Sequence, residues 1–156
     1  MIAFFVHGTP RPAGSKRAFP IYKGRGPSRR FTGRVAVTDD CVGSRDWKTN
    51  IHAAALMAYH QKPMAGPVRL SLTFIVRRPG NRYGSGRNRD QVRATAPPFP
   101  TVRPDVLKLA RAVEDALTDV LWCDDAQIVS ETLRKRYAGR DEMEGVQIEC
   151  NAEVAP

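Results

Sequence analysis

The segment from residue 104 to about residue 121 constrains the fold most, because its apolar side chains recur at i, i+3, i+4 and i+7. The stripe consists of Val106, Leu109, Ala110, Val113, Ala116, Leu117, Val120 and Leu121. Pro104 suits the first turn of a helix, where its missing N–H costs little. The opposite face carries Lys108, Arg111, Asp115 and Asp119, with Leu107 as a lone apolar residue among them. The sequence therefore predicts a helix with one buried face and one charged face.

Apolar patterns elsewhere predict the remaining elements. Strands are expected over residues 2–6, 68–76, 127–137 and 145–154. A second helix is expected over residues 44–61, with Ser44 as its N-cap. These elements predict an α/β chain of the α+β type, in which a small, mixed and mostly antiparallel sheet is flanked by two helices. The length of 156 residues suits a single domain, residues 1–156.

Two segments have no clear period. Residues 18–38 are broken by Gly24, Gly26, Pro27 and Gly33 and indicate irregular structure or a hairpin, with a short strand over residues 35–37. Residues 77–103 contain seven arginines and one aspartate, together with three glycines and several prolines. We expect a flexible, arginine-rich loop here, either an arm that becomes ordered on a phosphate backbone or a solvated tether.

Charge is divided unevenly along the chain. Residues 1–103 hold 19 basic and 4 acidic residues, whereas residues 104–156 hold 6 basic and 12 acidic ones. The total of +9 and the basic first part indicate a polyanionic partner, since neutralised phosphates release counterions. The acidic last part has two interpretations, a divalent metal site or ordinary charge pairing on a helix surface.

Several classes of protein are not indicated. No apolar run approaches the ~20 residues of a membrane span, and the first ten residues lack the pattern of a secretory signal. Cys41, Cys123 and Cys150 are an odd number without CxxC spacing, so neither a disulfide framework nor a structural zinc site is expected. We expect a protein of the reducing cytoplasm.

Carboxylates stand at both ends of the predicted 104–121 helix. Asp105 lies at its start, and Asp124 and Asp125 follow its end. At ~1.5 Å per residue the helix spans about 25 Å, so these groups meet only if the following turn or strand runs back toward the helix start. Otherwise Asp105 is a helix-start aspartate and the pair belongs to a turn.

Four runs of residues carry a family resemblance. Residues 8–17 read GTPRPAGSKR, residues 103–111 read RPDVLKLAR, residues 115–117 read DAL and residues 122–129 read WCDDAQIV. Together they resemble the RusA family of Holliday junction resolvases, whose signature is approximately K/R-P-D-[ILV]-D-N-L-x-K, then D-A-L, then D-D-x-Q-[VI]. The N-terminal run resembles the basic turn of that family.

The resemblance implies a crossover junction endodeoxyribonuclease of DNA recombination and repair, from a bacterial cell or a phage. Its members act as homodimers on four-way DNA junctions, and each subunit nicks one strand by phosphodiester hydrolysis. The implied cofactor is Mg²⁺, for which Mn²⁺ could substitute. The resemblance assigns metal binding to Asp105 and to the pair Asp124 and Asp125, of which Asp125 is the better match, and it places the basic catalytic residue on Arg111.

These assignments suggest a mechanism. Asp105 and Asp125 would hold Mg²⁺, which polarises the scissile phosphate and activates water. Arg111 would clamp the phosphate, form a salt bridge with Asp115, or both.

Two neighbouring positions depart from the family pattern. The second aspartate of D-x-D is replaced by Leu107 and the usual asparagine beside it by Lys108, and leucine offers no oxygen to Mg²⁺. Fewer protein ligands with extra waters could hold the metal, Asp124 or Asp115 could fill the gap, or the protein could bind junctions and cut them poorly.

Further candidates are predicted to contact DNA. The basic side chains expected on the phosphate backbone are Arg11, Lys16, Arg17, Arg82, Arg87, Arg89, Arg93 and Arg103. Lys108 has two interpretations, a phosphate contact or a solvated helix face. Phe99 either stacks on an unpaired base or packs over the core.

Three functions are therefore weighed: a Mg²⁺-dependent resolvase, a junction-binding protein that kept the fold but cuts weakly or not at all, and a basic RNA-binding module. Mg²⁺-dependent nicking of a synthetic junction separates the first two, and equal affinity for linear RNA and DNA junctions identifies the third.

Overall fold

The computed structural model describes residues 1–14, 16–39 and 41–153. A four-stranded sheet forms its centre, in the order β1 (Ile2–His7), β6 (Gly145–Ala152), β4 (Val68–Val76) and β5 (Ile128–Tyr137). The β1–β6 and β6–β4 pairs are antiparallel and the β4–β5 pair is parallel. The predicted mixed, mostly antiparallel sheet of an α+β fold is confirmed.

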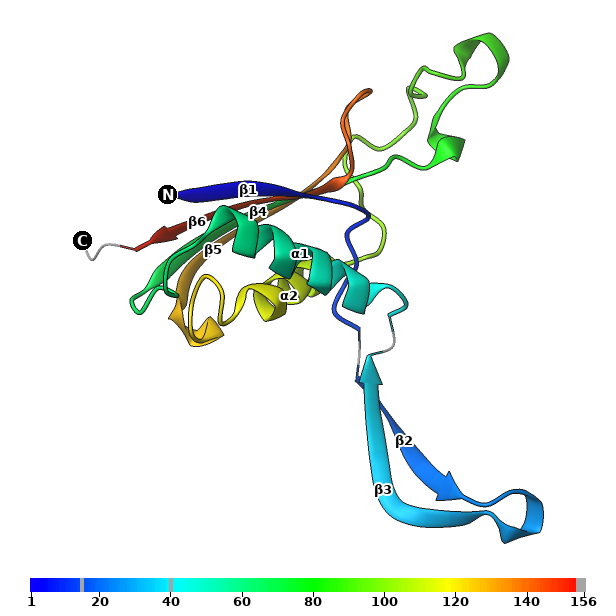
Figure 1. Cartoon of the computed structure of the whole chain (residues 1–156). Coiled ribbons are helices and arrows are strands. Elements are labelled where there is room, and N and C mark those ends of the chain that lie inside the picture. The colour runs from blue at the N-terminus through cyan, green and yellow to red at the C-terminus, as the bar shows by residue number, and fades with distance from the viewer. Residues whose placement is uncertain (15, 40, 154–156) are drawn as a thin grey trace.

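Two helices cover one face of this sheet (Figure 1). Helix α1 (Ser44–Ala58) packs against β1 and helix α2 (Val106–Leu117) packs against β4 and β5, while the helices also contact each other. The core lies in between, because the apolar side chains that alternate along β4 (Leu70, Leu72 and Phe74) face the helices and are fully buried. None of the helices in the described ranges combines the length and the hydropathy needed to cross a membrane.

The helix starts differ from the prediction. Ser44 is the first residue of α1 rather than its N-cap, which is Gly43 at φ 81°. The Ser44 Oγ is buried and has no hydrogen-bond partner among the described residues. Pro104 precedes α2 instead of occupying its first turn, because the helix begins at Val106 and Asp105 is the N-cap. The helix also ends earlier than expected, at Leu117.

Residues 16–39 form a two-stranded antiparallel hairpin apart from the central sheet. Its strands are β2 (Lys16–Lys23) and β3 (Arg30–Asp39). It projects away from the sheet and both helices (Figure 1). The hairpin interpretation of this segment is therefore confirmed, with much longer strands than the predicted one at residues 35–37.

The arginine-rich segment has more local structure than predicted. It contains the short 3-10 helices η2 (Gly80–Arg82) and η3 (Gly86–Asn88) and an isolated bridge between Tyr83 and Val92. The Arg93 Nε donates to the Tyr83 carbonyl oxygen at 2.6 Å. Backbone and side-chain bonds within the loop therefore hold it together.

Candidate functional site

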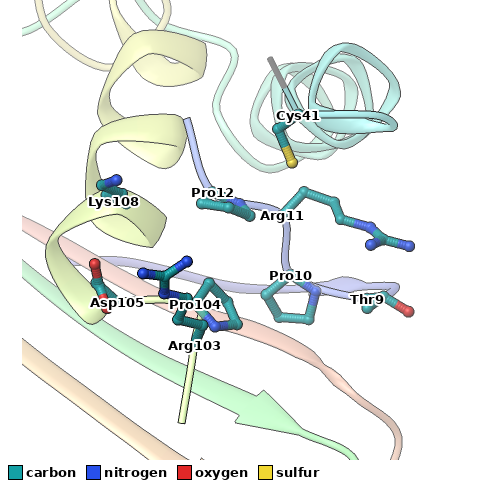
Figure 2. Close-up of a pocket in the computed structure, with 9 residues that line it drawn as sticks. All are labelled: Thr9, Pro10, Arg11, Pro12, Cys41, Arg103, Pro104, Asp105 and Lys108. Carbon is teal, nitrogen blue, oxygen red and sulfur yellow. The ribbon is translucent and has the colours of Figure 1, made fainter. Parts of the chain in front are cut away.

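A pocket of about 470 Å³ opens at the start of α2 (Figure 2). It is lined by Thr9, Pro10, Arg11, Pro12, Cys41, Arg103, Pro104, Asp105 and Lys108. Arg103, Asp105 and Lys108 lie on one side of the pocket, and Arg11 lies on the other (Figure 2). The structure thus brings together three of the predicted DNA-contacting cations and one predicted metal ligand.

Strand β5 positions this pocket. It runs antiparallel to α2, so that its far end returns to the start of the helix, where the Lys135 Nζ donates to the carbonyl oxygens of Val102 (2.9 Å) and Pro104 (2.7 Å). The Ala13 N–H donates to the Lys108 carbonyl oxygen at 2.8 Å, which fixes the loop after β1 against the helix. Arg103 and Asp105 therefore project from a backbone that Lys135 holds in place.

The Asp105 carboxylate is not used to cap the helix. Asp105 has the extended backbone of an N-cap residue, yet its side chain makes no capping hydrogen bond. The backbone N–H groups at the start of a helix and nearby cations favour an anionic group. Asp105 is consequently available to the pocket, where it is the only carboxylate among the lining residues that the structure describes.

Asp125 lies at the other end of α2 and is held by neighbouring donors. Its Oδ1 accepts hydrogen bonds from the Thr118 hydroxyl (2.7 Å) and from the Trp122 Nε1–H (2.9 Å). Asp124 serves as the N-cap of a short 3-10 helix, η4 (Asp125–Gln127), and accepts from the Ala126 N–H at 2.8 Å. Both aspartates of the pair thus help to form the turn that leads into β5.

Gln127 completes this turn. Its Oε1 accepts from the N–H groups of Cys123 (2.8 Å) and Asp124 (3.0 Å). Its Nε2 donates to the carbonyl oxygens of Met64 (2.7 Å) and Gly66 (2.9 Å), which lie between α1 and β4. The glutamine of the D-D-x-Q motif therefore ties two distant loops together.

Glu114 and Glu131, which the sequence interpretation did not single out, lie together beside the second half of α2. Burial, a side-chain hydrogen bond with Glu131 and the charges of Glu131, Asp125 and Asp115 raise the pKa of Glu114 to about 7. The alternation of β5 contained a signal for this contact, since Glu131 shares the helix-facing side of the strand with Leu133 and Lys135.

The residues of one chain do not fit the expected Mg²⁺ site. Asp105 and Asp125 are separated by the length of α2, whose 12 residues span about 18 Å. Leu107 is 69% exposed and supplies no oxygen. Among the residues that the structure describes, no group of three or more His, Cys, Asp or Glu side chains is arranged to hold a metal ion. The expectation that folding joins these aspartates within one chain is therefore wrong, because β5 starts beyond Asp125. The side chains that β5 directs toward α2 as it returns are Glu131, Leu133 and Lys135.

The other predicted residues are distributed over the surface. Arg111 is exposed on α2, and Asp115 pairs with Lys48 of α1 (Nζ to Oδ2, 2.6 Å) rather than with Arg111. The arginine-rich loop carries Arg82, Arg87, Arg89 and Arg93, all but Arg82 exposed. Phe99 is 56% exposed and so is not packed in the core. The side chains of Lys16 and Arg17 lie outside the part of the chain that the structure describes.

Comparison with protein families matches residues 19–149 to the family described as endodeoxyribonuclease RusA. The matched part includes both helices, the pocket residues Arg103, Asp105 and Lys108, and the turn at Asp124 to Gln127. A search of curated proteins found no match. Because the matched region covers most of the 156 residues, the chain belongs to the RusA family of endodeoxyribonucleases.

Proposed function

We propose that this chain binds four-way DNA junctions and cuts phosphodiester bonds in them as a structure-selective endonuclease. The observation that carries the proposal is the pocket at the start of α2, whose described lining combines the cations Arg11, Arg103 and Lys108 with one carboxylate, that of Asp105. A hollow lined by cations concentrates the field that attracts a DNA phosphate. Family membership supports Holliday junctions as the substrate class. A cytoplasmic location belongs to the same proposal.

In this proposal the residues in and around the pocket have different roles. Arg11, Arg103 and Lys108 bind phosphates and set the position of the DNA without reading its sequence. Lys135 acts through the backbone of residues 102–104 and is a positioning residue. Arg111, exposed further along α2, offsets the charge that grows on the phosphate during cleavage.

The cleavage site is proposed to need two copies of the chain. A twofold axis that pairs two α2 helices antiparallel would bring Asp105 of one copy close to Asp125 of the other. The exposed face of α2 favours such a pairing, because Lys108 and Arg111 occupy its first half and Glu114 and Asp115 its second half. Antiparallel helices would place opposite charges together and would cover the exposed Leu107.

Mg²⁺ is the proposed cofactor, with Asp105 of one subunit and Asp125 of the partner subunit as its protein ligands. Mg²⁺ commonly uses only one or two protein carboxylates and keeps several waters, so the loss of the oxygen at Leu107 does not preclude binding. When bound, the ion would polarise the phosphate and lower the pKa of water. Thr118 and Trp122 orient Asp125 through one of its oxygens, Oδ1, as a bound ligand requires.

Nicking of a synthetic four-way junction, with and without Mg²⁺, tests the proposal. We expect cleavage only with the metal, and we expect Asp105→Asn and Asp125→Asn to remove cleavage while junction binding is kept. Binding should weaken steeply between 50 and 200 mM salt, as phosphate contacts dictate. Full cleavage by both variants would contradict the residue assignment.

Junction binding without cutting is the second candidate function. The exposed Leu107 at the second D-x-D position and the separation of Asp105 from Asp125 within one chain favour it. Tight, salt-dependent binding by the wild-type dimer without Mg²⁺-dependent nicking would establish this function instead.

A further inference from the structure

The β2–β3 hairpin is a ribbon that the rest of the chain leaves uncovered. All residues from 18 to 37 are exposed except Ala36, which is half-buried. The ribbon projects well beyond the sheet and helices (Figure 1). A two-stranded ribbon is at best marginally stable in water on its own. Contact with another molecule would therefore stabilise the ribbon.

The ribbon is strongly cationic. Residues 16–39 contain seven Lys and Arg and one acidic residue, Asp39. Four of the cations, Lys23, Arg25, Arg29 and Arg30, flank or form the tip, where no acidic residue occurs. The tip turn requires a glycine, because Gly24 has φ +91° and a Cβ there would lie 2.4 Å from the Ser28 carbonyl oxygen. The fold thus presents a tight, purely basic tip.

Exposed aromatic rings stand beside these cations. The Tyr22 and Phe31 rings face each other across the strands, with centroids 5.8 Å apart, and are 45% and 53% exposed. The Arg29 guanidinium lies over the Tyr22 ring, 4.2 Å from its centroid. Cations interleaved with exposed rings are the arrangement by which proteins bind a nucleic-acid backbone and stack on accessible bases.

We infer that the β2–β3 hairpin is a second DNA-binding element, an arm that contacts the junction away from the pocket at the start of α2. This inference rests on the proposed function. The tip cations contact phosphates, while Tyr22 and Phe31 contact bases that are unstacked at the centre of the junction. A two-stranded ribbon has the width to enter a major groove. None of these tip residues is part of the pocket.

Charge favours DNA over a second copy of the chain as the occupant. Outside residues 16–39 the chain has 18 basic and 15 acidic residues, a net charge of +3. That surface as a whole does not complement an arm of charge +6, whereas a polyphosphate does. DNA also accounts for the tip lacking any carboxylate.

The test compares full-length wild type with Arg25→Gln/Arg30→Gln in junction binding over a range of salt. Loss of two phosphate contacts in each subunit, four in the proposed dimer, should make the slope of log K against log salt shallower by about 3.6 and weaken binding at low salt about tenfold or more. The matched control Arg25→Lys/Arg30→Lys keeps the charge and should bind almost as wild type does. Lys62→Gln, which removes an exposed cation between α1 and β4, should leave the slope unchanged.

Aromatic variants and oligomeric state complete the design. Tyr22→Leu/Phe31→Leu should reduce the preference for a junction over linear duplex while keeping the salt slope, because the phosphate contacts remain. Light scattering after size exclusion reports the oligomeric state of each variant. Junction affinity and slope unchanged in the Gln variant would overturn the inference, and so would loss of the dimer in the same variant, which would identify a second copy as the occupant. If wild type itself fails to bind junctions, the proposed function fails before the arm is tested.

Discussion

Gln127 makes four hydrogen bonds, two as an acceptor and two as a donor, and so holds the turn before β5 against the loop between α1 and β4. Gln127→Ala would leave these backbone groups without their side-chain partner. We expect the variant to lose about 2–4 kcal/mol of unfolding free energy, measured by urea denaturation. Gln61→Ala, at an exposed position, is the matched control and should change it by less than about 0.5 kcal/mol. Equal stability of the two variants would show that Gln127 is not a structural residue.

Glu114 gives the fold a pH dependence. Because its pKa is raised from 4.5 to about 7, the folded state binds this proton more tightly than the unfolded state does. The stabilisation is complete below pH 4.5 and is lost as the pH rises through about 7. The melting temperature of Glu114→Gln minus that of wild type should therefore be more positive at pH 8 than at pH 5. The same temperature difference at both pH values would contradict this account.

At the scale of elements, β5 connects the two ends of α2. It begins beside the Asp125 turn and ends where Lys135 holds the carbonyl oxygens of Val102 and Pro104. Lys135→Met should weaken junction binding roughly three- to tenfold, because Arg103 and Asp105 lose the support of their backbone. Arg134→Met, at the preceding residue on the opposite face of the strand, is the control and should bind nearly as wild type. Equal losses in the two variants would assign the effect to charge alone.

The central elements could be predicted from sequence because their burial follows a period. Alternation predicted β4 at its observed bounds, Val68–Val76, and the i, i+3, i+4 stripe predicted most of α2. The hairpin was harder, since Gly24, Gly26 and Gly33 interrupt it and neither of its faces is buried. Periodicity reports burial and is weak where a ribbon stands in solvent.

The site was predicted only in part. The motif at residues 103–111 predicted a role for Asp105, Arg103 was a candidate for DNA contact and Lys108 had two interpretations. The structure places these three around one pocket. The sequence could not give the direction of β5 relative to α2. It also could not give which residue of β5 lies beside the start of the helix. Those two facts decide that Lys135, rather than Asp125, reaches the start of the helix.

At the scale of the whole molecule, basic and acidic surfaces are separated along α2 and across the chain. The start of α2 and the hairpin are basic, whereas the second half of α2 gathers Glu114, Asp115, Asp125 and Glu131. The two halves of α2 are therefore complementary in charge if two copies of the helix pair antiparallel. The proposed nuclease depends on this pairing, because one chain keeps Asp105 and Asp125 at opposite ends of a helix.

The most direct measurement uses a mixed dimer of Asp105→Asn and Asp125→Asn subunits, co-expressed with different tags and purified as the heterodimer. In a shared arrangement one of its two sites contains both aspartates and the other contains neither. We therefore predict that each variant alone is inactive and that the mixed dimer nicks one strand of a junction in Mg²⁺. A mixed dimer as inactive as its parents, beside a wild type that cuts, would contradict a site shared between subunits.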